Sequence, residues 1–461
     1  MKILDCLKIK EKAYIEDLDN GLKVIIVPKK ESTKKFVIWG TKFGSIDNKF
    51  ILPETGEEVS VPDGVAHFLE HKMFEQPNGS NSLDTMMALG LDANAYTTND
   101  HTAYLFECSE DENFYKGLDE LMDYVQSPYY TDENVQKEKG IIGQEIMMYD
   151  DDPGFQLYLN ALKCLYSKCP IRIDIAGSID SIAPIDPDVL YKCYNTFYNP
   201  SNMVLVVCGN FEPQNILEEI KKRLKPSKNI GEIHRIYEEE PKEIDQKYME
   251  KTMSVSMPIF MIGLKDKVVD PSERVRRHMA IEVILDLLIG KSSNLYKELY
   301  EKQILLGEAD SEYEFSNQYA HALISGQSNN PQLVQKMLIT EIENMKKNGF
   351  VEKDFERMKR KIYGEFVTEF NDVASISRMF LADTVKQINS FDYVDEFDNI
   401  TMDYAKDILN ELFVEDKMVL SVIKNRIIRQ RSPMRKQAFA GERHRQNYPI
   451  PIPYKIALPL P

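Results

Sequence analysis

One short stretch, residues 65–74, holds the side chains with the clearest potential for chemistry. His67 and His71 are four residues apart, so in a helix they lie on one face, where two neutral imidazoles can chelate a divalent metal ion. Glu70 lies at the edge of that face and could take a proton from a metal-bound water molecule. The alternative is a helix with two ordinary histidines. The chain has seven histidines in all, and two of them around a glutamate favour the metal site.

A second predicted helix, from Asp132 to about Asp150, offers further carboxylates. Glu138 and Glu145 are seven residues apart, which is two helical turns, so they share a face. Zinc hydrolases keep three protein ligands and leave a fourth position for water. A glutamate from this distant helix would complete a set of two histidines and one glutamate, although the alternative for any single glutamate is a solvated side chain. The order His-x-x-Glu-His is the inverzincin signature.

The elements around the metal helix are predicted from local patterns. Residues 22–28 and 35–45 are β-branched and partly alternating, which predicts two strands. Asp63 is the predicted N-cap of the metal helix. Residues 91–108 predict two strands around a turn at 99–100, which would bring Asn94 and Ala95 close to the metal. A free edge there could pair with an extended peptide; the alternative is an ordinary core hairpin.

Composition limits the class of protein. At 461 residues the chain is expected to form two or more domains. A net charge of −17 disfavours nucleic acid and anionic lipid as partners, and favours a basic ligand if the ligand is charged. We find no apolar run long enough to span a membrane and no opening signal segment. The six scattered cysteines are typical of free thiols in a reducing cytosol, so a cytoplasmic protein is expected.

These motifs together resemble the pitrilysin/insulinase family of zinc peptidases. The resemblance rests on the five residues 67–71, on a glutamate 74 positions after His71, on a further glutamate seven before that one, and on the hairpin phrases 94–97 and 102–104. It covers roughly residues 15 to 425. The likeness is greater to the branch of the mitochondrial processing peptidase, whose chains have about this length.

The resemblance implies roles for particular residues. His67, His71 and Glu145 would hold one zinc ion, and Glu70 would be the general base. Glu138 would be a second carboxylate that orients the site. Substrates would bind as extended strands against the hairpin edge, and the hairpin residues expected to contact them are Asn94, Ala95 and Tyr96.

The family is built from two homologous halves, and the sequence itself shows the duplication. Residues 350–365 repeat the pattern of residues 130–145 at a constant offset of 220. Met358 replaces the counterpart of Glu138, and no His-x-x-Glu-His occurs in 268–290, so the second copy is not expected to bind zinc in the same way. The predicted fold class is α+β, with two homologous α/β-sandwich halves, each a mostly antiparallel sheet packed with helices.

The predicted organisation has four parts. Residues 1–225 form the zinc-binding domain, 226–250 a polar linker, and 251–425 the homologous domain without a zinc motif. Residues 426–461 form a basic, proline-rich tail that is expected to be disordered.

One departure from the family pattern concerns the second half. Active members often carry an arginine and a tyrosine there, which reach across to the substrate carbonyl. The matching places in this chain are Tyr300 and either Glu308 or Tyr313, so that part of the site is incomplete. A related, zinc-less chain could supply the missing surface, and a heterodimer with such a chain is expected. A homodimer is the alternative.

The sequence therefore predicts a zinc-dependent endopeptidase that cleaves short or unfolded peptides in an enclosed chamber. The alternative function is that of a binding or assembly subunit, without catalysis, that retains a zinc site.

Overall fold

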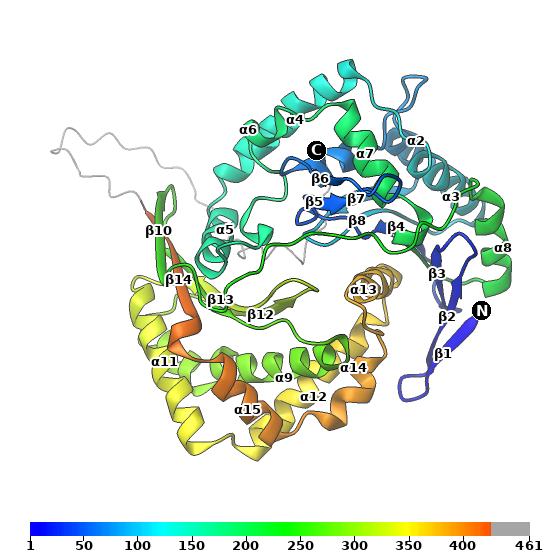
Figure 1. The fold of residues 1–461 in the computed structure, drawn as a ribbon. Coiled ribbons are helices and arrows are strands. Elements are labelled where there is room, and N and C mark those ends of the chain that lie inside the picture. Colours follow the sequence, from blue (N-terminus) through cyan, green and yellow to red (C-terminus); the bar gives the residue numbers. More distant parts are fainter. Residues whose placement is uncertain (426–461) are drawn as a thin grey trace, which may run out of the picture.

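The structure is a computed structural model that describes residues 1–425. The predicted tail, residues 426–461, lies outside the described residues. The described chain forms two halves, each built on its own β-sheet with helices packed against it (Figure 1).

The first sheet has seven strands in the order β1-β2-β3-β9-β4-β8-β7. Neighbouring strands are antiparallel except β3 and β9, which are parallel. In chain order the strands are β1 (Lys2–Cys6), β2 (Glu11–Asp17), β3 (Lys23–Pro28), β4 (Lys35–Thr41), β7 (Asp92–Thr97), β8 (Thr102–Cys108) and β9 (Met203–Gly209). The predicted strands and hairpin are confirmed, and β7 lies at the edge of the sheet. A separate small ribbon pairs β5 (Lys49–Ile51) with β6 (Glu58–Ser60).

The second sheet repeats five strands of the first in the same spatial order. Its order is β10-β14-β11-β13-β12, and only β10 and β14 are parallel. The strands are β10 (Tyr248–Met253), β11 (Ile259–Lys265), β12 (Asp310–Phe315), β13 (Ala320–Gln327) and β14 (Met418–Asn425). Because β12 takes the place that β7 has in the first sheet, the predicted fold of two homologous, mostly antiparallel halves is confirmed.

Helices of the first half cover one face of the first sheet. Alternate strand residues, among them Trp39 and Phe106, face these helices and form one apolar core with them. The helices of this half apart from α5 are α1 (Val65–Lys72), α2 (Ser82–Ala88), α3 (Asp111–Val125), α4 (Asp132–Asp150), α6 (Ile179–Ile182), α7 (Pro187–Phe197) and α8 (Pro213–Arg223).

Helices of the second half cover the second sheet in the same way. The core residues Phe260 and Ile262 of β11 pack with them. Apart from α13, these helices are α9 (Pro271–Ile289), α10 (Asn294–Glu301), α11 (Pro331–Asn348), α12 (Glu352–Glu369), α14 (Asp392–Asp395) and α15 (Met402–Leu412).

The two halves exchange one helix each. Helix α5 (Pro153–Leu165) follows α4 in the first half but packs on the second sheet. Helix α13 (Val373–Val385) follows α12 in the second half but packs on the first sheet, as Figure 1 also shows. Both ends of α13 lie 220 residues after those of α5, so the duplication extends through the exchange. Each sheet therefore has one face buried by its own half and the other face buried by a helix of the other half.

Residues 226–247 connect the halves, since β10 of the second sheet begins at Tyr248, and they are held by specific contacts. The Nε of Arg235 donates to the Oδ1 of Asp47 at 3.0 Å. Glu240 accepts backbone N–H groups of Lys168 and Cys169 at 2.7 Å each, and pairs with Lys265 of the second sheet. The segment is thus bound to both halves, and the predicted domain limits at 225 and 251 stay predictions.

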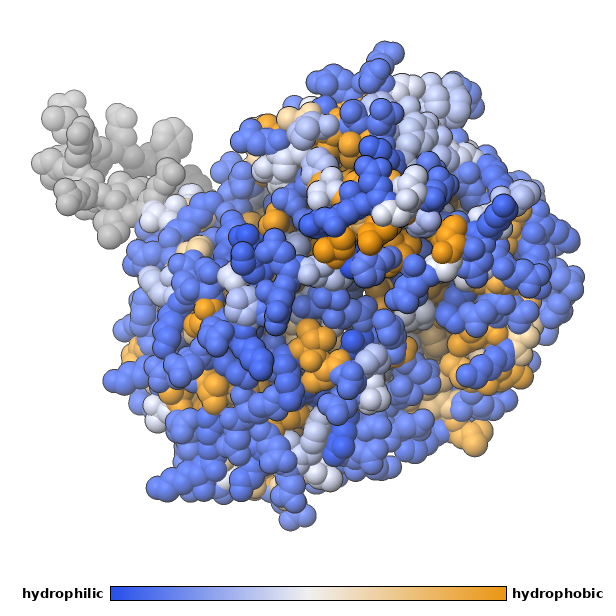
Figure 2. Space-filling view, in the orientation of Figure 1, coloured by the Kyte–Doolittle hydropathy of each residue, from blue (hydrophilic) through white to orange (hydrophobic). Residues whose placement is uncertain are grey.

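The surface agrees with the composition. The face seen in Figure 2 is mostly hydrophilic, with apolar side chains in small separate patches. Within residues 1–425, none of the helices combines the length and apolar character that a membrane span needs.

Candidate metal centre

Helix α1 begins differently from the prediction. Its N-cap is Gly64, with φ at 92°, and the cap makes no side-chain hydrogen bond. The Oδ1 of Asp63 instead accepts a hydrogen bond from Asn48 at 3.0 Å, so the prediction of Asp63 as the N-cap is wrong. Only glycine fits well at position 64, because φ is positive and a Cβ there would lie 2.4 Å from the carbonyl oxygen of Ala176.

Helices α1 and α4 bring two histidines and one glutamate together. The Nε2 of His67 lies 3.7 Å from one carboxylate oxygen of Glu145, and the Nε2 of His71 lies 3.5 Å from the other. One ligand atom from each residue lies within 4.8 Å of the other two, and this is the one such group found among the described residues. The Nε2 of His71 is buried and has no hydrogen-bond partner there. Two imidazole nitrogens and a carboxylate oxygen are a donor set that suits zinc.

Glu138 fixes which nitrogen of His71 faces this centre. The Nδ1–H of His71 donates to the Oε1 of Glu138 at 3.0 Å, which leaves Nε2 as the acceptor and metal-binding atom. The other oxygen of Glu138 accepts from Lys72 at 3.3 Å. Burial raises the pKa of Glu138, but the contacts with His71 and Lys72 outweigh it and hold that pKa below its usual value.

The pKa values of the two histidines are shifted in opposite directions. Burial, together with the neighbouring His71, lowers the pKa of His67 well below its ordinary value, so this ring is neutral and able to bind a metal. Burial also lowers the pKa of His71, but the hydrogen bond to Glu138 and the nearby Glu70 and Glu145 raise it above the ordinary value overall. Burial raises the pKa of Glu145 as well.

Glu70 lies on the same helix and is almost fully buried. Burial raises its pKa to about 7, against the opposing effects of His71 and of a hydrogen bond from Thr97. The Oγ1 of Thr97 donates that bond to the Oε2 of Glu70 at 2.6 Å. A carboxyl group with a pKa near neutrality can both accept and return a proton.

The predicted substrate-binding residues lie on the edge strand β7, and their side chains point in different directions. Ala95 packs into the core on the α1 side of the sheet, whereas Tyr96 packs on the α13 side. The Oδ1 of Asn94 accepts the backbone N–H of Ala95 at 2.8 Å. The ring of Tyr96 therefore lies on the face of the sheet opposite to helix α1, away from the side that carries the metal centre.

The second half has no comparable centre among its described residues. Helix α9 carries His278 and Glu282 at the same spacing as His67 and His71, with 3.8 Å between the Nε2 of His278 and the Oε1 of Glu282. Glu282 accepts the backbone N–H of Tyr313 in the edge strand β12 at 2.7 Å. Met358 is buried in the core at the place that corresponds to Glu138. Among the described residues, the second half therefore offers no group of three side chains that could hold a metal ion.

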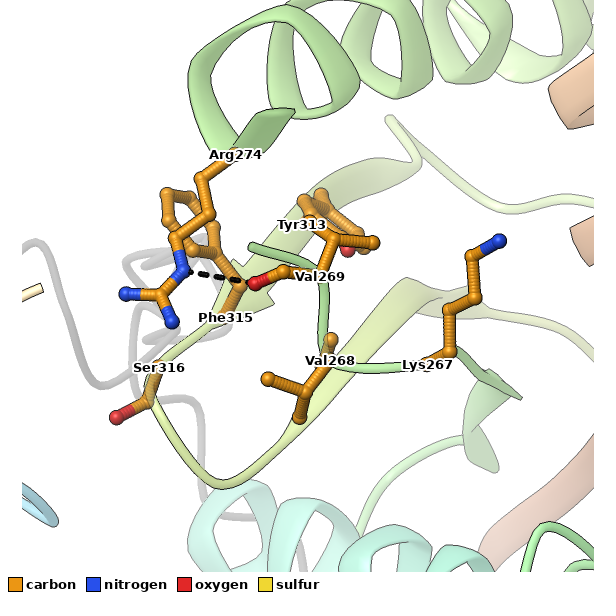
Figure 3. A pocket seen from close by; sticks show the side chains of 8 residues that line it. Lys267, Val268, Val269, Arg274, Tyr313, Phe315 and Ser316 are labelled. Atoms are coloured by element: carbon orange, nitrogen blue, oxygen red, sulfur yellow. Dashed lines mark hydrogen bonds between the residues drawn. The ribbon is translucent and has the colours of Figure 1, made fainter. Parts of the chain in front are cut away.

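Of the three second-half residues at the places of the family's arginine and tyrosine, one is exposed and two pair with other residues of the second half. Tyr300 is 56% exposed, and Glu308 pairs with Lys291. The hydroxyl of Tyr313 donates to Asp266 at 2.7 Å. Tyr313 also lines a small cavity of about 10 Å³ beside Arg274 (Figure 3), which has room for about one water molecule and no substrate.

A larger cavity, of about 900 Å³, lies where the two halves and the connecting segment meet. Its walls include Asp100 from the turn after β7, Arg235 from the connecting segment, and Ser316 from the turn after β12. The Oγ of Ser316 donates to Asp100 at 3.1 Å, which joins the two turns.

Comparison with known proteins identifies the family. Residues 57–168 match the domain described as insulinase (peptidase family M16), and residues 184–362 match the peptidase M16 inactive domain. The chain is 36% identical over 428 residues to the zinc protease YmfH of Bacillus subtilis, and the alignment covers 91% of this chain and 98% of YmfH. This chain belongs to the insulinase family.

Solved structures of this family share the fold. An M16-like peptidase from Alicyclobacillus acidocaldarius superposes with a TM-score of 0.86 at 32% identity, over 92% of this chain and 100% of that one. The periplasmic protease PqqL of Escherichia coli has a TM-score of 0.69 at 17% identity, and the match covers 89% of this chain but 47% of PqqL. At that identity the likeness to PqqL shows the fold alone.

Sequence reasoning missed two residues of the centre. Thr97 stands in the quoted hairpin phrase, but nothing in the sequence says that its hydroxyl reaches Glu70. Lys72 interrupts an apolar helix directly after His71, and its side chain is fully buried. Lys72 follows the core residues Phe68 and Leu69 by one helical turn, and a charged residue on this apolar side of the helix is the signal that could have found it.

Proposed function

We propose that this chain is a zinc-dependent endopeptidase for short or unfolded peptides, with one zinc ion held by His67, His71 and Glu145. The observation that carries the proposal is the pair of Nε2 atoms facing the carboxylate of Glu145, with the Nδ1 of His71 already bound to Glu138. When bound, zinc would act as a Lewis acid and lower the pKa of a water molecule to about 7.

The chain's own residues supply the proton transfers. Glu70 accepts the proton of the attacking water and returns it to the leaving amine. Thr97 keeps that carboxylate in place through its hydrogen bond. An extended peptide adds to the edge strand β7, so that the backbone around Asn94 and Ala95 holds it beside the metal centre. The proposed enclosed chamber would admit chains without a stable fold; the cavity of about 900 Å³ between the halves is lined by Asp100, from the turn after β7, and by none of the metal-centre residues.

A partner chain is part of the proposal. Because Tyr300 is exposed and Glu308 and Tyr313 pair with second-half residues, a related zinc-less chain would supply the missing contacts to the substrate, and a homodimer is the second possibility. This chain matches 47% of PqqL, so a single PqqL chain is long enough to contain a second unit of this size.

The six buried cysteines without disulfides support a reducing, cytoplasmic location.

The test compares wild type with Glu70→Gln on a mixed peptide pool, with bound zinc measured for each. We expect wild type to cleave peptides. We expect Glu70→Gln to bind zinc but to cleave at least a thousandfold more slowly. Glu133→Gln, an exposed glutamate of α4, is the control and should match wild type. Stoichiometric zinc without cleavage, alone or with any partner, would instead favour the binding or assembly subunit.

A further inference from the structure

Lys72 is a fully buried lysine next to a candidate metal ligand. Its side chain is 0% exposed, and its Nζ lies 2.8 Å from Glu75 and 3.3 Å from Glu138. Lysine is rarely buried completely unless it is paired, since removing its charge from water costs several kcal/mol. The chain carries this cost at the last residue of α1, surrounded by the core residues Phe68, Leu69 and Met73.

The contact with Lys72 restricts the rotation of the Glu138 carboxylate. The terminal torsion of a glutamate has broad, shallow preferences. In Glu138 one oxygen accepts from His71 and the other accepts from Lys72, so both ends of the group are held. Turning the carboxylate away from the ring of His71 would break the bond to Lys72 at the same time.

The balance of charge around the centre also indicates a role for Lys72. Glu70, Glu138 and Glu145 bring three negative charges when ionised, and a divalent cation would balance two of them. Lys72 is the cation that balances the third, while Glu75 is 26% exposed and partly hydrated. We propose that Lys72 is a positioning residue of the metal centre, which acts by holding Glu138 against His71; this inference rests on the proposed function.

The test measures zinc affinity of the full chain by competition with a chromophoric chelator, without reference to peptide cleavage. Lys72→Met should weaken zinc binding about tenfold, the lower end of the range for partners of ligand histidines. Lys72→Arg, which keeps the charge, should stay within about threefold of wild type. In the Glu138→Gln background, Lys72→Met should have no further effect, because the residue through which Lys72 acts is already changed.

The controls separate this role from general destabilisation. Lys265 is another buried lysine, paired with Glu240 far along the chain, and Lys265→Met should leave zinc affinity within twofold of wild type. Lys72→Leu, which also removes both the charge and the hydrogen bond to Glu138, replaces Lys72→Met if that variant does not fold, and the same tenfold loss is expected.

Two results would overturn the inference. One is zinc affinity within twofold of wild type in the uncharged variant, and the other is a further tenfold loss when Lys72→Met is added to Glu138→Gln. A wild-type chain that binds no zinc would overturn the proposed function itself, so the two failures are distinguishable.

Discussion

The hydroxyl of Thr97 and the carboxylate of Glu70 lie 2.6 Å apart, and their hydrogen bond joins the edge strand β7 to helix α1. One contact therefore positions both the strand that would bind the peptide and the carboxylate that would transfer protons during cleavage. A displacement of β7 relative to α1 would break this hydrogen bond.

Replacing Thr97 by valine should slow peptide cleavage about tenfold, because a hydrogen bond to a charged group contributes about 1.5–3 kcal/mol. That bond lowers the pKa of Glu70, so its loss raises this pKa, and the acidic limb of the pH–activity profile should move to higher pH. Zinc binding should be unchanged. Thr368→Val, at an exposed site on α12, is the control; an unmoved acidic limb in Thr97→Val would count against the contact.

Zinc itself should stabilise the fold measurably. Free zinc at about 1,000 times its dissociation constant should add about 4 kcal/mol to the free energy of unfolding of the metal-free chain. His67→Ala should lose this gain, whereas His234→Ala, an exposed histidine of the connecting segment, should keep it. Thermal unfolding with and without added zinc makes the comparison, and an equal shift in both variants would show that the metal binds elsewhere.

More of the candidate metal site than of the tertiary packing could be predicted from the sequence. The spacing of His67 and His71 identified a face, and the period of α4 placed Glu138 and Glu145 together. Glu145, however, stands 74 positions after His71, and no local signal shows that these two residues meet, so the third ligand came from the family resemblance.

Other features depended on tertiary context. An amphipathic pattern shows that a helix buries one face but not which sheet covers it, so the exchange of α5 and α13 between the halves was not predicted. Asp63 has the residue type of an N-cap, yet the close approach of Ala176 selects Gly64. The burial of Lys72 depends on Glu138, which lies 66 residues away.

The start of α1 should be the most sensitive glycine position near the centre. Gly64→Ala meets both a positive φ of 92° and a backbone oxygen 2.4 Å from the new Cβ, so a loss of more than about 3 kcal/mol in stability is expected, with weaker zinc binding. Gly79→Ala has a similar φ of 83° but open space, and should cost only about 1 kcal/mol. Denaturant unfolding measures both, and equal losses would mean that the contact with Ala176 is relieved.

Glu282 should give the second half a distinct dependence of stability on pH. Burial, reinforced by Asp286 and Glu365, raises its pKa from 4.5 to about 7 against the opposing hydrogen bond from Tyr313. Since the folded pKa lies above the unfolded one, the folded chain holds the proton more tightly, and this group's contribution to stability is lost as pH rises from about 4.5 to 7.

Glu282→Gln keeps an acceptor for the Tyr313 amide but does not ionise. The free energy of unfolding of this variant, relative to wild type, should therefore rise by about 2 kcal/mol between pH 5 and pH 8; the full shift would give about 3 kcal/mol, reduced because the side chain is 21% exposed. Urea unfolding of the metal-free proteins at several pH values tests this, with Glu133→Gln as the exposed control. A difference that stays constant across this range would show that Glu282 is already ionised at pH 5, and that the hydrogen bond from Tyr313 outweighs burial.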